Sequence, residues 1–525
     1  MTIWPQIGNV FALQRDRLFL IEAPTGRRYT YGEFYDLASR AAGLLQTQGV
    51  GPGDRVAVVL ANSPEFAALY FGCLFLGAVI VPVNPTLHPR EVNFILAHSG
   101  AKCILCSPAT EKLVDGIKAS PVSEKLLLVP FKERDQHPDN YRAQAFNLDS
   151  APPIEGEPQL DISGDGLFSI NFTSGTTSLP KGVAHKTSCL LENARIFNTE
   201  MAFNQDCCFL HVMPMGYMAG FLNTLLSPFM AGASIVLCRA FDAQTVLRFW
   251  QPVMEHGADT FWLSPTMVAS LLRLDRDRAG LDYCQKRVKT VCVGTAPLPL
   301  SIKRDFEAKY NVPLMESYGL SELLLVAGNS SKFPRVDGSV GRLLPGIEAR
   351  ISDEQAAPQG LEKNGEIWIR TPYLMAGYLN YQTLEPDFCN PGDYFPTGDL
   401  GHLAEDGHLF ITGRKKDLII RGGINVSPRS IEEILLQHGG VEQVAVFGLP
   451  DDFYGEEVVA VVKVKPGYGL ETIQPALVAL CRENLSPAAV PTRFFAVSQF
   501  PESTMGKIQK AKLREMFSQT GAAKG

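Results

Sequence analysis

One long apolar run constrains the fold of this chain more than any other feature. Residues 66–83 are almost wholly apolar, and the run is long enough to be considered as a membrane span. Gly77 divides it, which favours a buried helix over 66–76 followed by a core strand over 78–83. A helix and a strand that are apolar on all sides belong inside a layered α/β protein, so we expect no integral membrane association.

Helical and strand patterns alternate on both sides of this run. Residues 54–60 form another strand pattern that is unbroken after Arg55, as parallel sheets require. Thr30 and Glu33 are spaced like a capping box ahead of a helix. The alternation passes through the apolar run 126–129 and resumes at about residue 185, which predicts a doubly wound α/β fold.

The last third of the chain has a different residue pattern. Short apolar runs punctuated by Gly, Pro and Asp fill residues 335–412 and favour a small β-barrel or sheet. Beyond them, Ser427 is expected to cap a helix whose apolar face stops at Gly439. We therefore expect a large N-terminal domain, 1–413, of two doubly wound αβα layers plus the small β-barrel, followed by a small mobile α+β domain, 414–525.

Composition limits the class of protein. The net charge of −7 and pI of about 5.8 show that the chain lacks the overall positive charge typical of nucleic-acid-binding proteins, so any anion site must be local. The eleven cysteines follow no disulfide framework, and the N-terminus lacks the basic and apolar blocks of a secretion signal. These features predict a soluble cytoplasmic protein.

The first candidate site follows a strand pattern at 167–172. Residues 173–178 are all Ser, Thr or Gly, and they offer backbone N–H and hydroxyl donors that can converge on an anion, while Lys181 adds a positive charge. Pro180 precedes the lysine and Gly182 follows it, which excludes a Walker A loop. From the residues alone, a phosphate cradle and an ordinary polar surface loop are both open.

The order of this loop, and of five later motifs, resembles the adenylate-forming (AMP-binding) superfamily in its acyl- and aryl-CoA synthetase branch. The resemblance covers nearly the whole chain. The later motifs lie at 294–298, 318–322, 395–400, 414–432 and 501–508.

The resemblance implies roles for individual residues. The nucleotide-binding set is Thr173, Ser174, Gly175, Thr176, Thr177, Lys181, Gly294, Thr295, Ala296, Pro297, Tyr318, Gly319, Asp399, Arg414 and Asn425. In this set Tyr318 stacks on adenine, while Asp399 and Arg414 meet the ribose hydroxyls. Ser321 contacts the α-phosphate and Glu322 holds Mg²⁺, which agrees with the preference of that ion for carboxylate and phosphate oxygens.

The resemblance also implies an ATP-dependent acid–CoA ligase that works in two steps. Lys507 would catalyse the adenylation of a carboxylic acid by ATP with Mg²⁺. The C-terminal domain would then rotate about the hinge residue Lys416 and bring Gly422 and Gly423 to the site, where glycine admits the pantetheine arm of CoA. The thiol of CoA takes the acyl group.

The acyl pocket departs from the family pattern. Gly216 stands where a large aromatic residue is usual and Tyr217 stands where a histidine is usual, so the choice of acid is open. No carboxylate lies in 212–226, which disfavours an α-amino acid because its ammonium group would be unpaired. The expected substrate is an apolar aliphatic or ring-bearing acid. The expected wall is Met213, Met215, Gly216, Tyr217, Met218, Phe221, Thr295, Leu320 and Val326.

Several alternatives stay open at this level. The acyl group could pass in trans to the phosphopantetheine of a carrier protein instead of free CoA. A non-catalytic ATP-binding relative would be expected to lack Lys507, Glu322 or Asp399, and all three are present. A luciferase-like oxygenase shares the same motifs. The exact acid, the pathway and the oligomeric state, including a homodimer, are not determined by these patterns.

Overall fold

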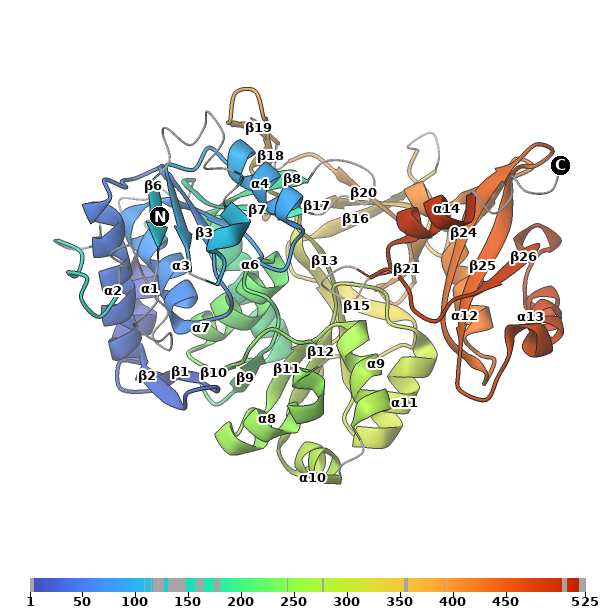
Figure 1. Cartoon of the computed structure of the whole chain (residues 1–525), viewed down its shortest axis with the longest axis horizontal. Helices are drawn as coiled ribbons and strands as arrows, with labels where there is room; N and C mark the ends of the chain where they lie inside the picture. The colour runs from blue at the N-terminus through green and yellow to red at the C-terminus, as the bar shows by residue number, and fades with distance from the viewer. Residues whose placement is uncertain are drawn as a thin grey trace.

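The computed structural model describes residues 4–107, 109–114, 116, 127–130, 148–155, 158, 165–173, 180–242, 244–275, 278–353, 357–390, 392–502 and 508–518. Two large sheets and their helices occupy the chain up to about residue 414, and a third, smaller sheet follows at one end of the molecule (Figure 1). The structure is thus α/β with a separate C-terminal unit, as the sequence predicts. Within these residues, no helix combines the length and the apolar character needed to cross a membrane.

The sheet built around the first apolar run has the order β19-β18-β8-β7-β4-β3-β5-β6. Its strands are β3 (Arg55–Val59), β4 (Val79–Pro82), β5 (Cys103–Cys106), β6 (Leu127–Pro130), β7 (Leu167–Thr173), β8 (Lys181–Lys186), β18 (Gly377–Leu379) and β19 (Pro386–Phe388). Strands β3, β4, β5 and β6 run parallel, and Val56 of β3 lies opposite Ile80 of β4. The run 66–83 is therefore a helix and a strand, as predicted: α3 (Pro64–Leu76) is buried along its whole length and ends at Gly77 in the left-handed conformation.

The larger sheet has the order β16-β17-β20-β21-β15-β14-β13-β12-β11-β9-β10-β1-β2. Its strands are β1 (Leu18–Glu22), β2 (Arg27–Thr30), β9 (Cys208–His211), β10 (Ser234–Leu237), β11 (Thr260–Leu263), β12 (Thr290–Val293), β13 (Leu314–Leu320), β14 (Leu324–Gly328), β15 (Ser339–Leu343), β16 (Glu348–Ser352), β17 (Gly365–Arg370), β20 (Phe395–Leu403) and β21 (His408–Arg414). Strands β1, β10, β9, β11, β12 and β13 are parallel, and the remaining pairs are antiparallel.

The β-rich segment differs from the expected small β-barrel. Its strands β15, β16, β17, β20 and β21 extend the larger sheet, because β15 pairs with β14, which itself pairs with β13. In the described part of the chain the hydrogen-bonded path runs on from strand to strand and does not close on itself. The antiparallel hairpin of β13 and β14 therefore joins the parallel region to the β-rich region within a single sheet.

Helices fill the spaces beside these sheets. The α-helices are α1 (Trp4–Leu13), α2 (Tyr31–Thr47), α3 (Pro64–Leu76), α4 (Pro89–His98), α6 (Thr187–Met201), α7 (Ser227–Ala231), α8 (Trp250–His256), α9 (Pro265–Leu274), α10 (Arg278–Arg287), α11 (Leu300–Tyr310), α12 (Pro428–Leu435), α13 (Leu470–Asn484) and α14 (Lys510–Ser518). Shorter turns are η1 (Glu111–Val114), η5 (Thr245–Arg248), η6 (Lys415–Asp417) and η7 (Pro487–Ala489), and η4 (Ala219–Leu226) is a π-helix. The capping box that the sequence predicts at Thr30 and Glu33 is present at the start of α2.

The C-terminal unit is built on the order β23-β22-β25-β24, with β26 beside β25. These strands are β22 (Ile419–Arg421), β23 (Ile424–Val426), β24 (Val441–Asp451), β25 (Gly455–Val464) and β26 (Arg493–Ala496). Ser427 precedes α12 as expected, but its hydroxyl does not cap the helix. It donates to the carbonyl of Thr412, 3.0 Å away, and the helix ends at Leu435 rather than beside Gly439. The Ser427 hydroxyl thus forms a hydrogen bond to strand β21 instead of capping its own helix.

The two units also meet through side chains. Arg273 of α9 and Glu442 of β24 form an ion pair, and Lys463 of β25 contacts the same carboxylate at 2.9 Å. Lys415 in the connection bonds Glu366 of β17 at 2.9 Å. The domain boundary after residue 413 and the hinge at Lys416 stay predictions.

Candidate active site

A buried carboxylate lies at the centre of the residues that the sequence singles out. Asp399 on β20 faces Arg414 on β21 in the strand register, and the Arg414 Nε lies 2.7 Å from Asp399 Oδ1. The Tyr318 hydroxyl donates to Asp399 Oδ2 at 2.7 Å. The Asp399 side chain is 3% exposed while that of Arg414 is 40% exposed, so the guanidinium reaches solvent and the carboxylate does not.

This arrangement can bind a diol. Each carboxylate oxygen has a further lone pair, and the guanidinium has further N–H donors, so donors and acceptors are both present for neighbouring hydroxyl groups. Burial, followed by the negative charge of Asp399, raises the pKa of Tyr318 well above its usual range. Tyr318 therefore stays a neutral donor to Asp399 throughout the physiological range.

The predicted phosphate loop connects two paired strand ends. Thr173 ends β7 and lies opposite Lys181, which begins β8. Ser174, Gly175, Thr176 and Thr177 lie outside the described residues. The Lys181 Nζ is 4.8 Å from the centre of the Tyr378 ring, a cation–π contact that holds the ammonium beside the site.

Tyr378 links the loop to the predicted metal ligand. Its hydroxyl donates to Glu322 Oε1 at 2.8 Å, and its pKa is raised by burial and by the Glu322 charge. The described residues contain no cluster of three or more His, Cys, Asp or Glu side chains suited to a metal ion. A single carboxylate fits an ion that arrives already bound to phosphate oxygens, which is the usual mode for Mg²⁺ with nucleotides.

A buried histidine fixes the backbone next to Glu322. The His185 Nε2 lies 2.6 Å from the carbonyl oxygen of Ser321, and His185 has no exposed surface. Burial lowers its pKa to about 4, so the ring is neutral near pH 7 and Nε2 carries the proton that it donates to the carbonyl. Ser321 and Glu322 follow directly after strand β13, and this bond sets the direction of the turn that presents them.

Two turns bring backbone close to the same region. Gly294 follows β12, and Thr295 has a φ of +73°, an unfavourable value for a β-branched residue. Ala296 and Pro297 complete this turn. Gly319 lies at a bulge between β13 and β14, where an added Cβ would come within 2.3 Å of the Leu324 carbonyl oxygen. Only glycine fits at position 319, which explains its place in the motif.

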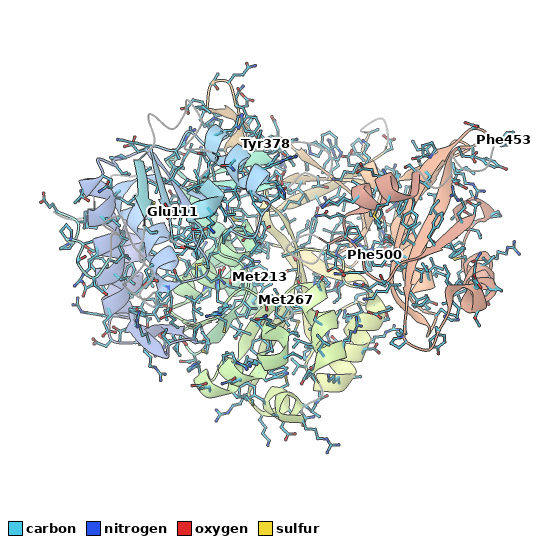
Figure 2. All side chains as sticks on the ribbon, viewed as in Figure 1. Glu111, Met213, Met267, Tyr378, Phe453 and Phe500 are labelled. Carbon is cyan, nitrogen blue, oxygen red and sulfur yellow. The ribbon has the colours of Figure 1, made fainter. Side chains whose placement is uncertain are left out.

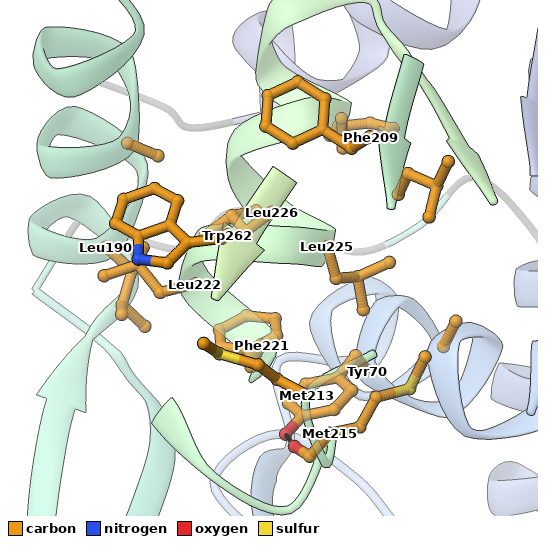
Figure 3. Close-up of a cluster of buried hydrophobic side chains, with 14 of the residues drawn as sticks. Tyr70, Leu190, Phe209, Met213, Met215, Phe221, Leu222, Leu225, Leu226 and Trp262 are labelled. Atoms are coloured by element: carbon orange, nitrogen blue, oxygen red, sulfur yellow. Dashed lines mark hydrogen bonds between the residues drawn. The ribbon is translucent and has the colours of Figure 1, made fainter. Parts of the chain in front are cut away.

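The predicted acyl wall is a set of apolar side chains behind the loop that follows β9. Met213 and Met215 are buried, and Phe221 of the π-helix stacks on Tyr70 with ring centres 4.2 Å apart (Figure 3). Leu320 and Val326 lie on the two strands of the β13–β14 hairpin. The region is apolar and adaptable, because methionine fits irregular spaces.

Two side chains outside the motifs hold this loop in place. Asn62 donates to the Met213 carbonyl and accepts from the Met215 N–H, both at 2.9 Å. The Tyr70 hydroxyl donates to the Met215 carbonyl at 2.7 Å. The unusual Gly216 has a steric cause, since an added Cβ would lie 2.6 Å from the Asn84 backbone nitrogen. Tyr217 is half-buried next to it.

The predicted C-terminal residues lie apart from this group. Gly422 and Gly423 form the turn between β22 and β23, both with positive φ, and Gly422 donates to the Tyr454 carbonyl at 2.7 Å. Phe453 beside them is 85% exposed and lies at the outer tip of the C-terminal unit, whereas the buried Phe500 lies on its inner side (Figure 2). Lys416 and Asn425 are exposed, and Lys507 lies outside the described residues.

Sequence reasoning missed Tyr378, His185, Asn62 and Tyr70. Each acts through one to three hydrogen bonds to residues more than 50 positions away. No local spacing marks such a contact. Only Tyr70 gave a signal in the sequence. Its hydroxyl lies in a run that is otherwise apolar, and a polar atom in a buried helix needs a hydrogen-bond partner.

Comparison with known proteins identifies the family. The profile of AMP-binding enzymes matches residues 9–379, and the profile of their C-terminal domain matches residues 430–507. The chain belongs to the AMP-binding enzyme family, which confirms the resemblance noted in the sequence. Sulfoacetate–CoA ligase of Cupriavidus necator is 31% identical, over 95% of this chain and 94% of that protein.

Other relatives agree with this assignment. A long-chain-fatty-acid–CoA ligase of Mycobacterium tuberculosis is also 31% identical, over 95% of both chains. Among solved structures, ATP-bound MatB from Rhodopseudomonas palustris is 27% identical, with a TM-score of 0.86 over 98% of this chain and 99% of that one.

Proposed function

We propose that this chain is an ATP-dependent, AMP-forming acid–CoA ligase that acts on a carboxylic acid with an uncharged, largely apolar body. The relatives named above are CoA ligases, and this chain matches them over nearly their whole length. Their similarity agrees with the enzyme class and with the substrates ATP and CoA that the sequence predicts. The observation that carries the proposal is the buried Asp399, held between Tyr318 and Arg414 in the arrangement that a ribose requires.

In the first step an oxygen of the substrate carboxylate attacks the α-phosphorus of ATP. The bond to the pyrophosphate oxygen breaks, and acyl-AMP and pyrophosphate form. Lys181 and the loop before it would hold the phosphates, and Asp399 with Arg414 would hold the ribose. A Mg²⁺ ion held by Glu322 would neutralise phosphate charge. Lys507 would lie between the carboxylate and the phosphate, so positioning and charge neutralisation drive the step.

In the second step the thiol of CoA attacks the acyl carbon. The carbon–oxygen bond to AMP breaks, the thioester forms and the thiol proton leaves to solvent. The Gly422 N–H donates to the carbonyl of Tyr454, which follows Phe453 at the outer tip of the C-terminal unit, so the proposal requires this unit to turn before Gly422 and Gly423 can reach the site. We infer that Lys416, in the turn between β21 and β22, is the hinge of this rotation.

The acid is inferred from the acyl side alone. Residues 212–226 contain no charged side chain, so a second charge on the acid would have no partner there. The two ligases named above point in two directions: one acts on sulfoacetate, and the other acts on long-chain fatty acids. The apolar wall of Met213, Met215 and Phe221 favours an acid without a second charge.

The acceptor and the location complete the proposal. Transfer to a carrier protein in trans is the alternative to CoA, and a homodimer is a separate question that solution mass measurement answers. All eleven cysteines lie in the described part of the chain and none of them forms a disulfide bond there, which suits a reducing compartment such as the cytoplasm.

The test is acid-dependent turnover with ATP, Mg²⁺ and CoA, in which AMP, pyrophosphate and free thiol are measured together. The acid panel contains fatty, aryl and amino acids together with malonate, oxalate and sulfoacetate. Thiol loss equal to AMP release supports the ligase, and pyrophosphate release without thiol loss would assign the acyl group to a carrier protein. Selective use of amino acids or of the doubly charged acids would contradict the proposed acid class.

A further inference from the structure

An unpaired polar atom lies in the apolar wall of the acyl side. Trp262 is the third of the four residues of strand β11 (Thr260–Leu263) and is 1% exposed, and its indole Nε1 has no hydrogen-bond partner among the described residues. Figure 3 shows the indole among apolar side chains that include Leu190 and Leu222. A buried donor without a hydrogen bond destabilises the fold, so this donor gains from any acceptor that reaches it.

The position of this donor connects it to the proposed substrate site. Parallel strands β11 and β12 end side by side, and an added Cβ on Gly294, just after β12, would lie 3.5 Å from the Trp262 Nε1. The same point would lie 2.8 Å from the Ser317 Oγ on β13. Ligands of such sheets bind beyond the carboxyl ends of the strands. The donor thus lies next to the turn of Gly294 and Thr295, which the sequence resemblance assigns to the nucleotide site and, at Thr295, also to the acyl wall.

The neighbouring strand end provides a contrast. His211 ends β9, next to β11 in the sheet, and its Nδ1 lies 3.1 Å from the Thr224 carbonyl oxygen of the π-helix. The Nδ1 of the His211 ring has therefore found a backbone partner in the same layer, whereas its Nε2, like the Trp262 Nε1, has no hydrogen-bond partner among the described residues. The contrast lies in the N–H donor, which is paired in His211 and unpaired in Trp262. A tryptophan that served only to fill the core would need no donor in an apolar surrounding, and phenylalanine would do as well.

We propose that the indole N–H of Trp262 is a specificity determinant that binds a hydrogen-bond acceptor in the body of the acyl group. The preferred acid then carries an uncharged acceptor, such as a carbonyl oxygen, remote from the carboxylate that is activated. This inference rests on the proposed function and narrows its substrate class. A site that must satisfy a buried donor discriminates strongly against an analogue that lacks the acceptor.

The test compares acids that differ only in one oxo group. Hexanoate is set against 4-oxohexanoate and 5-oxohexanoate, and 4-phenylbutyrate is set against 4-oxo-4-phenylbutyrate. The expected result is that at least one oxo acid exceeds its parent by about tenfold in kcat/KM for acid-dependent AMP formation. Wild-type enzyme that prefers the parent acid in every pair would overturn the proposal without any variant.

Trp262→Phe removes the N–H and keeps an aromatic ring. It should bring the kcat/KM values for the oxo acid and its parent to within about twofold of each other. The value for the oxo acid should fall, and the value for the parent acid should not rise. Trp250→Phe is the matched control, because the Trp250 Nε1 already donates to Asp275 at 2.9 Å. It should leave the ratio between acids unchanged, and thermal unfolding of both variants reports their stability.

A second readout does not depend on turnover. Binding of the oxo acid should change the intrinsic tryptophan fluorescence of the wild type and of Trp250→Phe, and the change should be lost in Trp262→Phe. An unchanged acid ratio in Trp262→Phe would contradict the inference while the ligase activity stands. Absence of AMP formation with every acid would contradict the proposed function itself, and with it this inference.

Discussion

The nucleotide side and the acyl side of the candidate site differ in how their polar groups are paired. On the nucleotide side, Asp399, Tyr318 and Glu322 are each joined to a partner side chain at 2.7–2.8 Å. On the acyl side, the wall is apolar, the methionines are adaptable, and the buried N–H of Trp262 is unpaired. A fixed polar framework suits one invariant ligand, and an adaptable wall suits an acid that differs from enzyme to enzyme.

This comparison explains why the reaction class is easier to infer than the substrate. The motif residues concentrate on the proposed nucleotide side, where each would have a chemical task that few other residue types can perform. The acyl side is defined by shape, and shape depends on contacts such as that between Gly216 and the Asn84 backbone. The predictions below probe the two sides separately.

The largest effect is expected for Lys507→Ala. Loss of the proposed catalytic charge should lower acid adenylation by about 10²- to 10³-fold, because that charge acts where negative charge accumulates in the transition state. Thioester formation from supplied acyl-AMP and CoA should continue. Separate assays of the two half-reactions check this, with Lys512→Ala on the exposed face of α14 as the control. Loss of both half-reactions would contradict the assigned division of labour.

Asp399→Asn should have the next largest effect and should act on the nucleotide side alone. It leaves Arg414 without its charged partner and is expected to lower kcat/KM for ATP by about 10-fold to 100-fold. The KM for the acid should change by less than about threefold if the two sides are independent. Steady-state kinetics with each substrate varied measures both, and Asp452→Asn at an exposed position is the control. An equal rise in both KM values would show that the sides are coupled.

The two buried histidines, one on each side, should give the protein a common pH dependence. Burial lowers the pKa of His185 and of His211 to about 4, below the usual value near 6.5. The unfolded chain therefore binds more protons between these values. Stability is fully present above pH 6.5, falls as the pH drops toward 4, and changes no further from this cause below it.

At pH 5 each histidine should cost about 2 kcal/mol of folding free energy relative to pH 7. Denaturant unfolding across this range measures the loss. His185→Gln and His211→Gln should each flatten the profile by a similar amount, after any constant loss of stability is subtracted. A profile that stays unchanged in one variant would mean that this histidine is already protonated or is exposed in the folded state.

The smallest effect is expected for Tyr378→Phe, which keeps the ring beneath Lys181 and removes the hydroxyl from Glu322. The Mg²⁺ concentration that gives half-maximal activity should rise by about tenfold, because loss of a group that orients a metal ligand commonly weakens metal binding by about that factor. Titration of the reaction with Mg²⁺ at constant ATP measures the change. Tyr381→Phe is a suitable comparison, because its hydroxyl bonds the Pro180 carbonyl and not Glu322. Equal effects of the two substitutions would argue against a specific link to the metal ligand.

Much of the fold was predictable because it depends on short-range patterns. The apolar run 66–83 contains its own stop signal at Gly77, and the capping box at Thr30 is complete within four residues. The helix cap at Ser427 was mispredicted for a long-range reason, since the Thr412 carbonyl competes for the same hydroxyl. The β-rich segment likewise joins the larger sheet through β14, which no local pattern reveals.

By itself, the sequence determined the α/β class and the family, and it predicted which residue types would meet the nucleotide, because these depend on periodicity and on short motifs with fixed chemistry. The tertiary structure alone decided which groups pair: Tyr378 with Glu322, His185 with the Ser321 carbonyl, and Asn62 with the loop at 213–215. It also left the Trp262 Nε1 without a hydrogen-bond partner among the described residues. A hydrogen bond depends on distances of tenths of an ångström between residues far apart in the chain, and only the folded arrangement fixes such distances.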